Sequence, residues 1–299
     1  MSDFQFSLVC AFLAMTFWGL GDFLIQKTIR KIGNLQTLLW INLVAGLGLA
    51  PFILKDLPAI FIGTNIWSLI IMTIVGLFYS IFLFKAYGEG KLAVVEVLMI
   101  GELPFTVILG LIFFHEKINS EQVLIIMLIL LGTLLISKSR KTWWGKVSEF
   151  FGKKKFVWEK GVLLALAAVV FSALYSFLTA VNSRNISALM AVWFPWMLGS
   201  LFLLIYIASQ KGLKLFWRTS FNHRGLILLA AIIDTAAWVF YALAVGRGKL
   251  SVVTPIIAGY AVIAMFLGIR FNKERISRWQ YLGATLVLLG VVIISFISD

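Results

Sequence analysis

The sequence has few charged residues, cysteines and histidines for its length. Charged residues make up 13% of the 299 positions, roughly half the share in a typical soluble domain. That scarcity argues against a soluble enzyme, whose surface needs charge, and against a disordered chain, which combines high charge with low hydrophobicity. The lone Cys10 excludes an internal disulfide and a thiolate metal cluster. Because His115 and His223 lie far apart, the sequence predicts no metal site and no cofactor.

Hydrophobic residues, by contrast, fill 61% of the chain, and its mean hydropathy is +1.00. A helix that crosses a bilayer needs roughly 20 apolar residues, and the sequence contains ten runs of about that length. Since lipid cannot hydrogen-bond the backbone, each run must be a helix. These runs predict an all-α polytopic membrane protein with ten transmembrane helices. The expected spans are 4–27, 34–54, 66–87, 91–114, 120–137, 161–181, 186–208, 225–245, 250–271 and 277–297.

Positive charge is distributed unevenly between the loops. The chain has 26 Lys and Arg against 13 Asp and Glu, and 21 of the basic residues fall in the loops after the first, third, fifth, seventh and ninth spans. Basic loops stay in the cytoplasm, so the charge distribution predicts that both termini lie outside the cytoplasm, across the cell membrane. The basic loops are expected to contact anionic lipid headgroups. No basic stretch lies in a soluble segment, so nucleic acid is not an expected partner.

The longest loop divides the chain into two halves. It covers residues 138–160 and carries eight basic and two acidic residues. Its Trp and Phe side chains have the spacing of an amphipathic helix that lies among the lipid headgroups. The predicted domains are therefore a first five-helix repeat at 1–137, a basic amphipathic linker at 138–160, and a second five-helix repeat at 161–299.

The two halves repeat each other in sequence. At an offset of 158 residues, 22 of the 56 positions across 82–137 are identical, including a Gly-x-Gly-Lys-Leu turn that begins at Gly88 and again at Gly246. The first two spans match the sixth and seventh more weakly, at an offset of 154. Because five is an odd number of spans, the second half must enter the membrane from the opposite face. The expected architecture is two inverted five-helix repeats.

These features resemble a known transporter family. The Trp18-Gly19-Leu20 segment, the Glu116-Lys117-Ile118 and Glu274-Arg275-Ile276 span ends, and a Leu-Leu-Gly in spans five and ten are similar to EamA-type members of the drug/metabolite transporter superfamily. The resemblance implies a ten-helix bundle that transports small organic metabolites or drugs. Relatives often have Glu-Pro in span four, where this chain has Glu102-Leu103-Pro104. Relatives also place both termini in the cytoplasm, whereas the loop charges here indicate the opposite orientation.

Four acidic residues lie inside the predicted spans: Asp22, Glu96, Glu102 and Asp234. Each costs roughly 2.5–3.5 kcal/mol to insert, so each is expected to face the interior of the bundle or water. They are candidates for a proton relay or for binding a cation. The structural alternative is that hydrogen bonds within the bundle hold each acid in place. Glu102, near the middle of span four, is the first candidate for proton coupling.

Aromatic residues accompany two of these acids. Trp18 lies four residues before Asp22 and Trp238 four residues after Asp234, so on a helix each indole shares a face with an acid. Such a pair suits an organic ammonium group through charge and cation–π attraction, although aromatic residues are common enough here for chance neighbours. Four tyrosines at membrane depth are further candidates for the same cavity: Tyr79, Tyr175, Tyr241 and Tyr260.

Two prolines are expected to interrupt spans. Pro195 and Pro255 fall inside spans seven and nine, and an interrupted helix exposes backbone carbonyls to a substrate. Trp193 and Trp196, on either side of the first proline, are expected to join the aromatic cavity.

The inverted repeat favours a secondary transporter, since alternating access uses two oppositely oriented halves with the substrate near the midplane. The expected small-molecule substrate is an amino acid, an amine, or a cationic or aromatic compound. Coupling to protons and uncoupled diffusion both fit, as do a monomer and a homodimer. The alternatives are a membrane-embedded lipid-modifying enzyme and a non-transporting membrane sensor. Because His and Cys are scarce, an enzyme is the less favoured reading.

Overall fold

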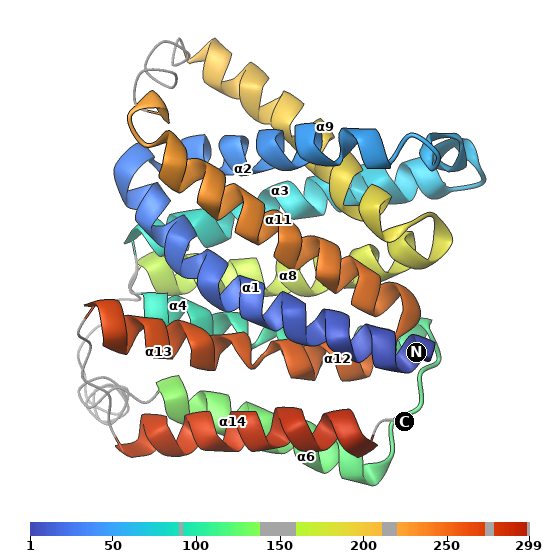
Figure 1. Ribbon diagram of the computed structural model, residues 1–299, viewed down its shortest axis with the longest axis vertical. Coiled ribbons are helices and arrows are strands. Elements are labelled where there is room, and N and C mark those ends of the chain that lie inside the picture. The colour runs from blue at the N-terminus through green and yellow to red at the C-terminus, as the bar shows by residue number, and fades with distance from the viewer. Residues whose placement is uncertain (90–91, 138–159, 211–219, 273–277, 298–299) are drawn as a thin grey trace, which may run out of the picture.

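The computed structural model describes residues 1–89, 92–137, 160–210, 220–272 and 278–297, and every regular element within these ranges is helical. Figure 1 shows a bundle of helices with both chain termini at one end. We call that end the terminal face. The opposite end, where α1 finishes with Arg30 and Lys31 in its last turn, is the basic face. The predicted linker at 138–160 lies outside the described residues, apart from Lys160 at the start of α8.

Each predicted span falls on one helix, except that the second covers α2 and the short helix η1, and the fourth and ninth each cover two consecutive helices. The first half contains α1 (Asp3–Ile32), α2 (Asn34–Leu49), η1 (Ala50–Phe52), η2 (Leu57–Phe61), α3 (Asn65–Glu89), α4 (Leu92–Met99), α5 (Glu102–Phe113) and α6 (Ser120–Ser137). The second half contains α8 (Lys160–Asn185), α9 (Ala188–Ser209), α11 (Arg224–Arg247), α12 (Leu250–Ile257), α13 (Tyr260–Asn272) and α14 (Arg278–Ile297).

Local sequence sets both ends of the first helix. Ser2 caps α1: its hydroxyl accepts from the Gln5 amide, and the Gln5 side chain accepts from the Ser2 amide. The helix ends at Gly33, whose φ of 94° favours glycine and lets the chain turn directly into α2.

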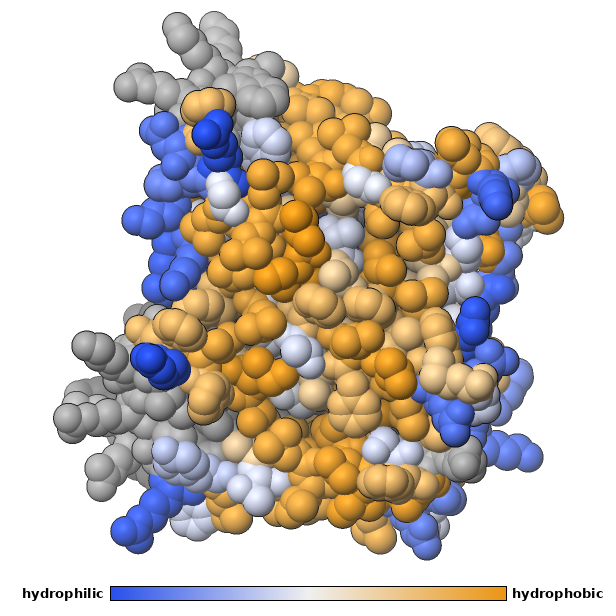
Figure 2. Space-filling model, viewed as in Figure 1, coloured by the Kyte–Doolittle hydropathy of each residue, from blue (hydrophilic) through white to orange (hydrophobic). Residues whose placement is uncertain are grey.

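The surface of the bundle is apolar across its middle. Figure 2 shows a broad hydrophobic area between two hydrophilic edges, which correspond to the terminal and basic faces. Six described helices are long and apolar enough to cross a membrane: Asp3–Ile32, Asn34–Phe52, Asn65–Glu89, Leu163–Asn185, Ala188–Ser209 and Arg224–Arg247. Large side chains such as Leu124 on α6 and Phe296 on α14 are exposed. A surface of this kind fits lipid rather than water, as expected for a multi-pass membrane protein.

The fourth and ninth spans are each broken into two helices at equivalent glycines. Gly101 separates α4 from α5, and Gly259, 158 residues later, separates α12 from α13. At both breaks the glycine amide donates to the carbonyl three residues earlier, of Leu98 or Ile256. A Cβ at Gly101 would lie 2.9 Å from the Leu98 oxygen, so the tight turn has no room for a side chain. The matched glycines therefore mark two equivalent helix breaks.

The prediction that Pro195 interrupts span seven is wrong. Helix α9 continues through Pro195, which is buried, because a proline removes only one backbone donor and neighbouring helices can support the turn. In span nine the break lies at Ala258–Gly259 rather than at Pro255, which falls inside α12. The glycine, not the proline, accompanies the break.

The helices pack in pairs that repeat between the halves. Helix α1 packs along α11 and α3 packs along α8, which are equivalent pairs when the halves are exchanged, and α2 packs on α9 as α6 packs on α14. The first helices of the two halves, α1 and α8, run in opposite directions (Figure 1). Both observations agree with the predicted pair of inverted repeats.

Candidate substrate cavity

A cavity lies inside the bundle where α1, α2 and α3 meet α8, α9 and α11, and it contains about 930 Å³ of space not filled by protein atoms. This figure includes space that is open to solvent at the mouth of the cavity. Eight of the ten candidate residues line it: Trp18, Asp22, Tyr79, Glu102, Tyr175, Asp234, Trp238 and Tyr260. The other two, Glu96 and Tyr241, lie behind the wall, each in contact with a residue that lines the cavity.

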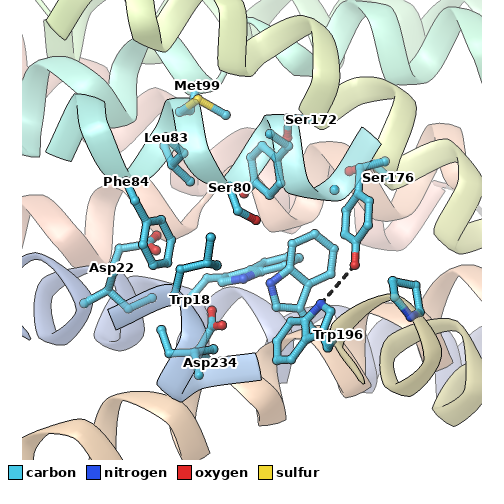
Figure 3. A pocket seen from close by; sticks show the side chains of 18 of the residues that line it. Trp18, Asp22, Ser80, Leu83, Phe84, Met99, Ser172, Ser176, Trp196 and Asp234 are labelled. Carbon is cyan, nitrogen blue, oxygen red and sulfur yellow. Dashed lines mark hydrogen bonds between the residues drawn. The ribbon is translucent and has the colours of Figure 1, made fainter. Parts of the chain in front are cut away.

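Two walls of the cavity are equivalent in the repeat but differ in chemistry. The α1/α11 wall carries large acidic and aromatic side chains: Trp18, Asp22, Asp234 and Trp238. At offsets of 154 and 158 the α8/α3 wall has small residues instead: Ser172, Ser176, Gly76 and Ser80. In Figure 3, Ser80 and Ser172 lie in the upper part of the view, with Asp22 to the left and Asp234 below. The small residues of one wall leave space opposite the large residues of the other.

Gly76 is the smallest of these residues, and its size is required by a close contact. A Cβ at this position would lie 2.6 Å from Cε2 of Tyr175. The Tyr175 hydroxyl in turn accepts a hydrogen bond from Nε1 of Trp196 at 3.0 Å, the bond drawn in Figure 3. Gly76 therefore lets the Tyr175 ring take a position in which it bonds to Trp196 and forms part of the wall.

Three carboxyl groups face the cavity. Asp22 and Asp234 are buried and close enough to interact with each other. Glu102, in the first turn of α5, accepts a hydrogen bond from the Ser172 hydroxyl of the opposite wall. Among the described residues that line the cavity, none is Lys, Arg or His. The site therefore has an excess of acidic groups, which favours a ligand that carries positive charge.

Trp238 is the centre of the aromatic part of the cavity. Its ring centroid lies 4.9 Å from that of Trp18, 5.0 Å from that of Tyr175 and 5.7 Å from that of Tyr241, in edge-to-face arrangements. Tyr79 and Trp196 contact the same indole at 6.2 and 6.4 Å. Five rings thus hold Trp238 in place beside Asp234, and ring faces of this kind can bind an organic cation.

Sequence reasoning missed the hydrogen-bond partners of two acids. Ser172, which donates to Glu102, and Tyr87, whose hydroxyl lies 2.8 Å from Oε1 of Glu96, were not candidates. The repeat offset could have found Ser172, because it is the equivalent of Trp18. Tyr87 carries no comparable signal, since its equivalent is Val245.

Trp193 does not join the cavity, in contrast to the expectation from its sequence position. Its Nε1 donates to the Gly46 carbonyl at 2.9 Å, and its ring packs on a separate small core that contains Ile53, Leu69 and Met190. Three residues further along α9, Trp196 does line the cavity. The two residues point in similar directions, but Trp193 lies almost one turn closer to the start of α9, beyond the depth of the cavity.

At the terminal face a carboxylate joins the two halves. Glu116, just after α5, accepts the Leu250 amide at Oε1 and the Ser251 amide at Oε2, both at 2.9 Å. These amides form the first turn of α12, so Glu116 binds a helix N-terminus of the other half. Its Oε1 also lies 3.0 Å from Nη2 of Arg184, in the last turn of α8.

Arg184 is held on several sides. Its Nε donates to the Val245 carbonyl at 3.0 Å, and its Nη2 donates to the Gly248 carbonyl at 2.8 Å. The guanidinium also lies 3.8 Å above the ring of Phe114. Burial alone would raise the pKa of Glu116, but the amides of Ser251 and Leu250 and the Arg184 guanidinium outweigh it, so this pKa lies below its ordinary value. Glu116 is therefore ionised at neutral pH.

Comparison with known proteins gives two matches. Residues 5–138 and 159–296 each match the EamA-like transporter family. A solved structure entitled "Crystal structure of protein" has a TM-score of 0.69 and 16% sequence identity, and the match covers 97% of this chain and 96% of that chain. At this identity the likeness concerns the fold alone. No curated protein matches the sequence significantly.

Proposed function

Since the chain belongs to the EamA-like transporter family, we propose that it is a secondary transporter that moves small organic metabolites across the cell membrane by alternating access. In this proposal α4 with α5, α12 with α13, α6 and α14 each form a span, so the chain crosses the membrane ten times. The basic face lies in the cytoplasm and both termini lie outside it. The observation that carries the proposal is the cavity between two inverted halves, where such transporters bind their substrates.

The cavity extends toward one face only, which supports alternating access. Five residues near the basic face line it: Ile25, Leu38, Leu83, Phe84 and Tyr87. Their repeat equivalents near the terminal face do not: Thr179, Val192, Tyr241, Ala242 and Val245. In this proposal the difference corresponds to a conformation in which the terminal face is closed and the basic face is open. Exchanging the conformations of the halves would close the basic face instead.

The contact between Glu116 and Arg184 holds this conformation. It joins α8 and α12 to the loop after α5 at the terminal face. The repeat equivalent of Arg184 is Arg30, which is exposed at the basic face. We therefore expect the Glu116–Arg184 pair to break when the terminal face opens, and Arg30 to become buried at the same time.

The substrate in this proposal is an organic cation or zwitterion with an apolar or aromatic body. Asp22 and Asp234 attract its charged group, and the rings around Trp238 contact its body. Transport is coupled to protons: Asp22 and Glu102 together exchange one proton for the cation, releasing it as the cation binds and regaining it when the cation leaves, because an acid buried in a membrane span is costly to leave charged without a partner.

Three ligands that share a phenyl ring test the proposed charge preference. Phenethylamine is a cation, phenylalanine a zwitterion and 3-phenylpropionate an anion. A ligand that binds only the folded protein raises its Tm, so we expect the order phenethylamine, phenylalanine, 3-phenylpropionate, with no shift for the last. Asp234→Asn should remove the shift that phenethylamine causes. Asp3→Asn, which removes a charge from an exposed acid in the same helix bundle, is the matched control.

Counterflow in proteoliposomes then separates transport from the alternatives. Protein preloaded with the ligand that binds best should exchange it for labelled ligand outside, and Asp234→Asn should not. Binding without exchange would favour a membrane sensor. Chemical change in the lipid or the ligand would favour an enzyme. Equal stabilisation by the anion would overturn the proposed substrate class.

A further inference from the structure

Glu96 is an acid inside the bundle that does not line the cavity. It lies on α4 and is 2% exposed. Its Oε1 is 2.8 Å from the Tyr87 hydroxyl, and its Oε2 has no hydrogen-bond partner in the described part of the chain. No ion pair to Glu96 is present there either. An ionised carboxylate is costly in such surroundings, so this site suits a carboxyl group that holds a proton.

Tyr87 connects Glu96 to the cavity. The tyrosine is 1% exposed and forms part of the cavity wall. Asp22 lines the same cavity as Tyr87 and is close enough to interact with its hydroxyl, which lies at 2.8 Å from Glu96. A phenol has one O–H donor and can also accept, so it can donate to one carboxyl group while it accepts from the other. The distance of 2.8 Å between Tyr87 and Glu96 fits donation in either direction.

We propose that Glu96 is a proton-binding site behind the cavity, which acts through Tyr87 to position and stabilise the Asp22 carboxylate for a cation. This inference rests on the proposed function. In the empty cavity Asp22 and Glu96 both hold protons, and the pair is neutral. When a cation binds, the Asp22 carboxyl releases its proton to water. Glu96 keeps its proton and donates a hydrogen bond to Oη of Tyr87, whose own O–H donates to the Asp22 carboxylate.

Charge and protons balance in this scheme. One proton leaves for each cation that binds, so the pair and its ligand together stay neutral. Glu96 never bears the negative charge, and its role is to orient the single O–H of Tyr87 toward Asp22. If Glu96 were ionised, Tyr87 would donate to it instead, and Asp22 would lose its donor.

Besides Tyr87, four titratable groups interact with Glu96. Tyr260 approaches from α13, Glu102 from α5, Asp22 from α1 and Tyr79 from α3. Helices α6 and α8 also pack on α4, but no charged group of theirs is paired with Glu96 among the described residues. Glu102 already accepts from Ser172. Of the groups that face Glu96, Tyr87 lies within hydrogen-bond distance of it, at 2.8 Å, and we therefore assign the link to Asp22 to Tyr87.

Calorimetric binding of benzyltrimethylammonium to the purified protein tests this role. The charge of this aromatic cation does not change with pH, so titration in two buffers of different ionisation enthalpy gives both Kd and the number of protons released. We expect the unaltered protein to release about one proton per cation. Glu96→Gln should bind within about threefold of that affinity and release the same number, because its amide N–H replaces the donor of a protonated Glu96.

Variants that remove a hydrogen bond between Glu96, Tyr87 and Asp22 should behave differently. Glu96→Ala and Tyr87→Phe should each weaken binding roughly tenfold or more, since a hydrogen bond to a charged group is lost. Because both substitutions interrupt the same series of hydrogen bonds, the double variant should bind the cation no more weakly than Tyr87→Phe alone. Asp22→Asn should release no proton. Asp3→Asn is the control for loss of an acid, and Tm measurements check that each variant folds.

Specific results would overturn the inference. If Glu96→Gln no longer releases a proton, Glu96 itself exchanges the proton and Asp22 does not. Unchanged affinity in Tyr87→Phe would show that the hydrogen bonds through Tyr87 do not contribute to cation binding. If the unaltered protein binds neither benzyltrimethylammonium nor phenethylamine, the proposed function fails, and this inference fails with it. If the unaltered protein does bind the cation, a contrary result for the variants overturns this inference and leaves the proposed function standing.

Discussion

Replacing Glu116 with glutamine should weaken the closed terminal face. The carboxylate accepts two backbone amides from the first turn of α12 and pairs with Arg184. Glutamine keeps the shape and one acceptor oxygen, but its amide group would face a backbone donor, and the charge is lost. The substitution therefore removes one charge-assisted hydrogen bond entirely and weakens two others.

The size of this effect follows from the burial of the pair. The Glu116 side chain is 6% exposed and that of Arg184 is 26% exposed. Hydrogen bonds to charged groups contribute roughly 1.5–3 kcal/mol each, and breaking a fully buried ion pair costs roughly 3–5 kcal/mol. Arg184 keeps its two backbone acceptors and some contact with water. We therefore expect a loss of about 2–3 kcal/mol, which lowers Tm by roughly 3–5 °C in a chain of this size.

The effect should depend on pH in one direction. The folded protein holds the pKa of Glu116 below the ordinary value of 4.5. A depressed carboxyl pKa stabilises the folded state fully above the unfolded pKa, and this contribution is lost as pH falls through the folded pKa. The difference in Tm between the unaltered protein and Glu116→Gln should thus be constant near neutral pH and shrink below about pH 4.5. Thermal unfolding in detergent at pH 7, 5 and 4 measures it.

Cys10 reports the opening of this face. It is the chain's one cysteine, lies in the first third of α1, the helix that begins at the terminal face, and is 3% exposed. We expect Glu116→Gln to increase the rate at which a maleimide labels Cys10. Glu121→Gln, at an exposed acid in the first turn of α6, is the matched control. Equal Tm and equal labelling for the two variants would refute the reasoning, as would a Tm difference that does not change between pH 7 and pH 4.

Four other outcomes are expected. Glu102→Gln should abolish proton-driven flux in proteoliposomes while the protein stays folded, and unchanged flux and pH dependence would exclude Glu102 from coupling. Gly76→Ala should displace the Tyr175 ring and weaken phenethylamine binding, measured by tryptophan fluorescence. Gly48→Ala is the control and should leave binding unchanged, because nothing lies within 4 Å of the added Cβ. Trp238→Ala should cost roughly 3–5 kcal/mol of stability. It should also remove the fluorescence response to ligand, whereas loss of a purely structural side chain would leave that response in the folded protein. A tag after Asp299 should be labelled from outside the cell, and protection from an impermeant reagent would contradict the orientation.

The helices and the acid–indole pairs could be predicted from local sequence. Apolar runs of sufficient length must be helical in lipid, and a spacing of four residues puts Trp18 beside Asp22 whatever the tertiary packing. The repeat offset also identifies equivalent helices, which is why the pairing of α1 with α11 and α3 with α8 is regular. The helices and the acid–indole pairs depend on the sequence of a single helix, and the helix pairing depends on the alignment of the two halves.

The opposite wall of the cavity could not be predicted in the same way. Ser80, Ser172 and Ser176 are small residues in apolar helices, and such residues occur as often in helix contacts as in cavities. Their meaning depends on what lies across from them, which only packing determines. The repeat contains part of this information, since each small residue aligns with a Trp or Asp of the α1/α11 wall.

The contact between Tyr87 and Glu96 depends on the break between spans three and four. The two residues are nine positions apart, at the end of α3 and within α4. Helical periodicity says nothing about residues on either side of a turn. For the same reason Pro195 was misleading: a proline predicts a missing hydrogen bond, whereas the surrounding helices decide whether the helix breaks.

The arrangement of the two acids has a consequence for the proposed transport cycle. Asp22 lies on a helix of the first half and Asp234 on a helix of the second, and the two helices pack along each other. A cation between them contacts both halves, so its affinity changes when the halves move relative to each other. Only such a difference in affinity lets a ligand shift a conformational equilibrium. The repeat thus provides two faces that can open in turn, and the α1/α11 wall, which spans both halves, lets the bound charge influence which face is open.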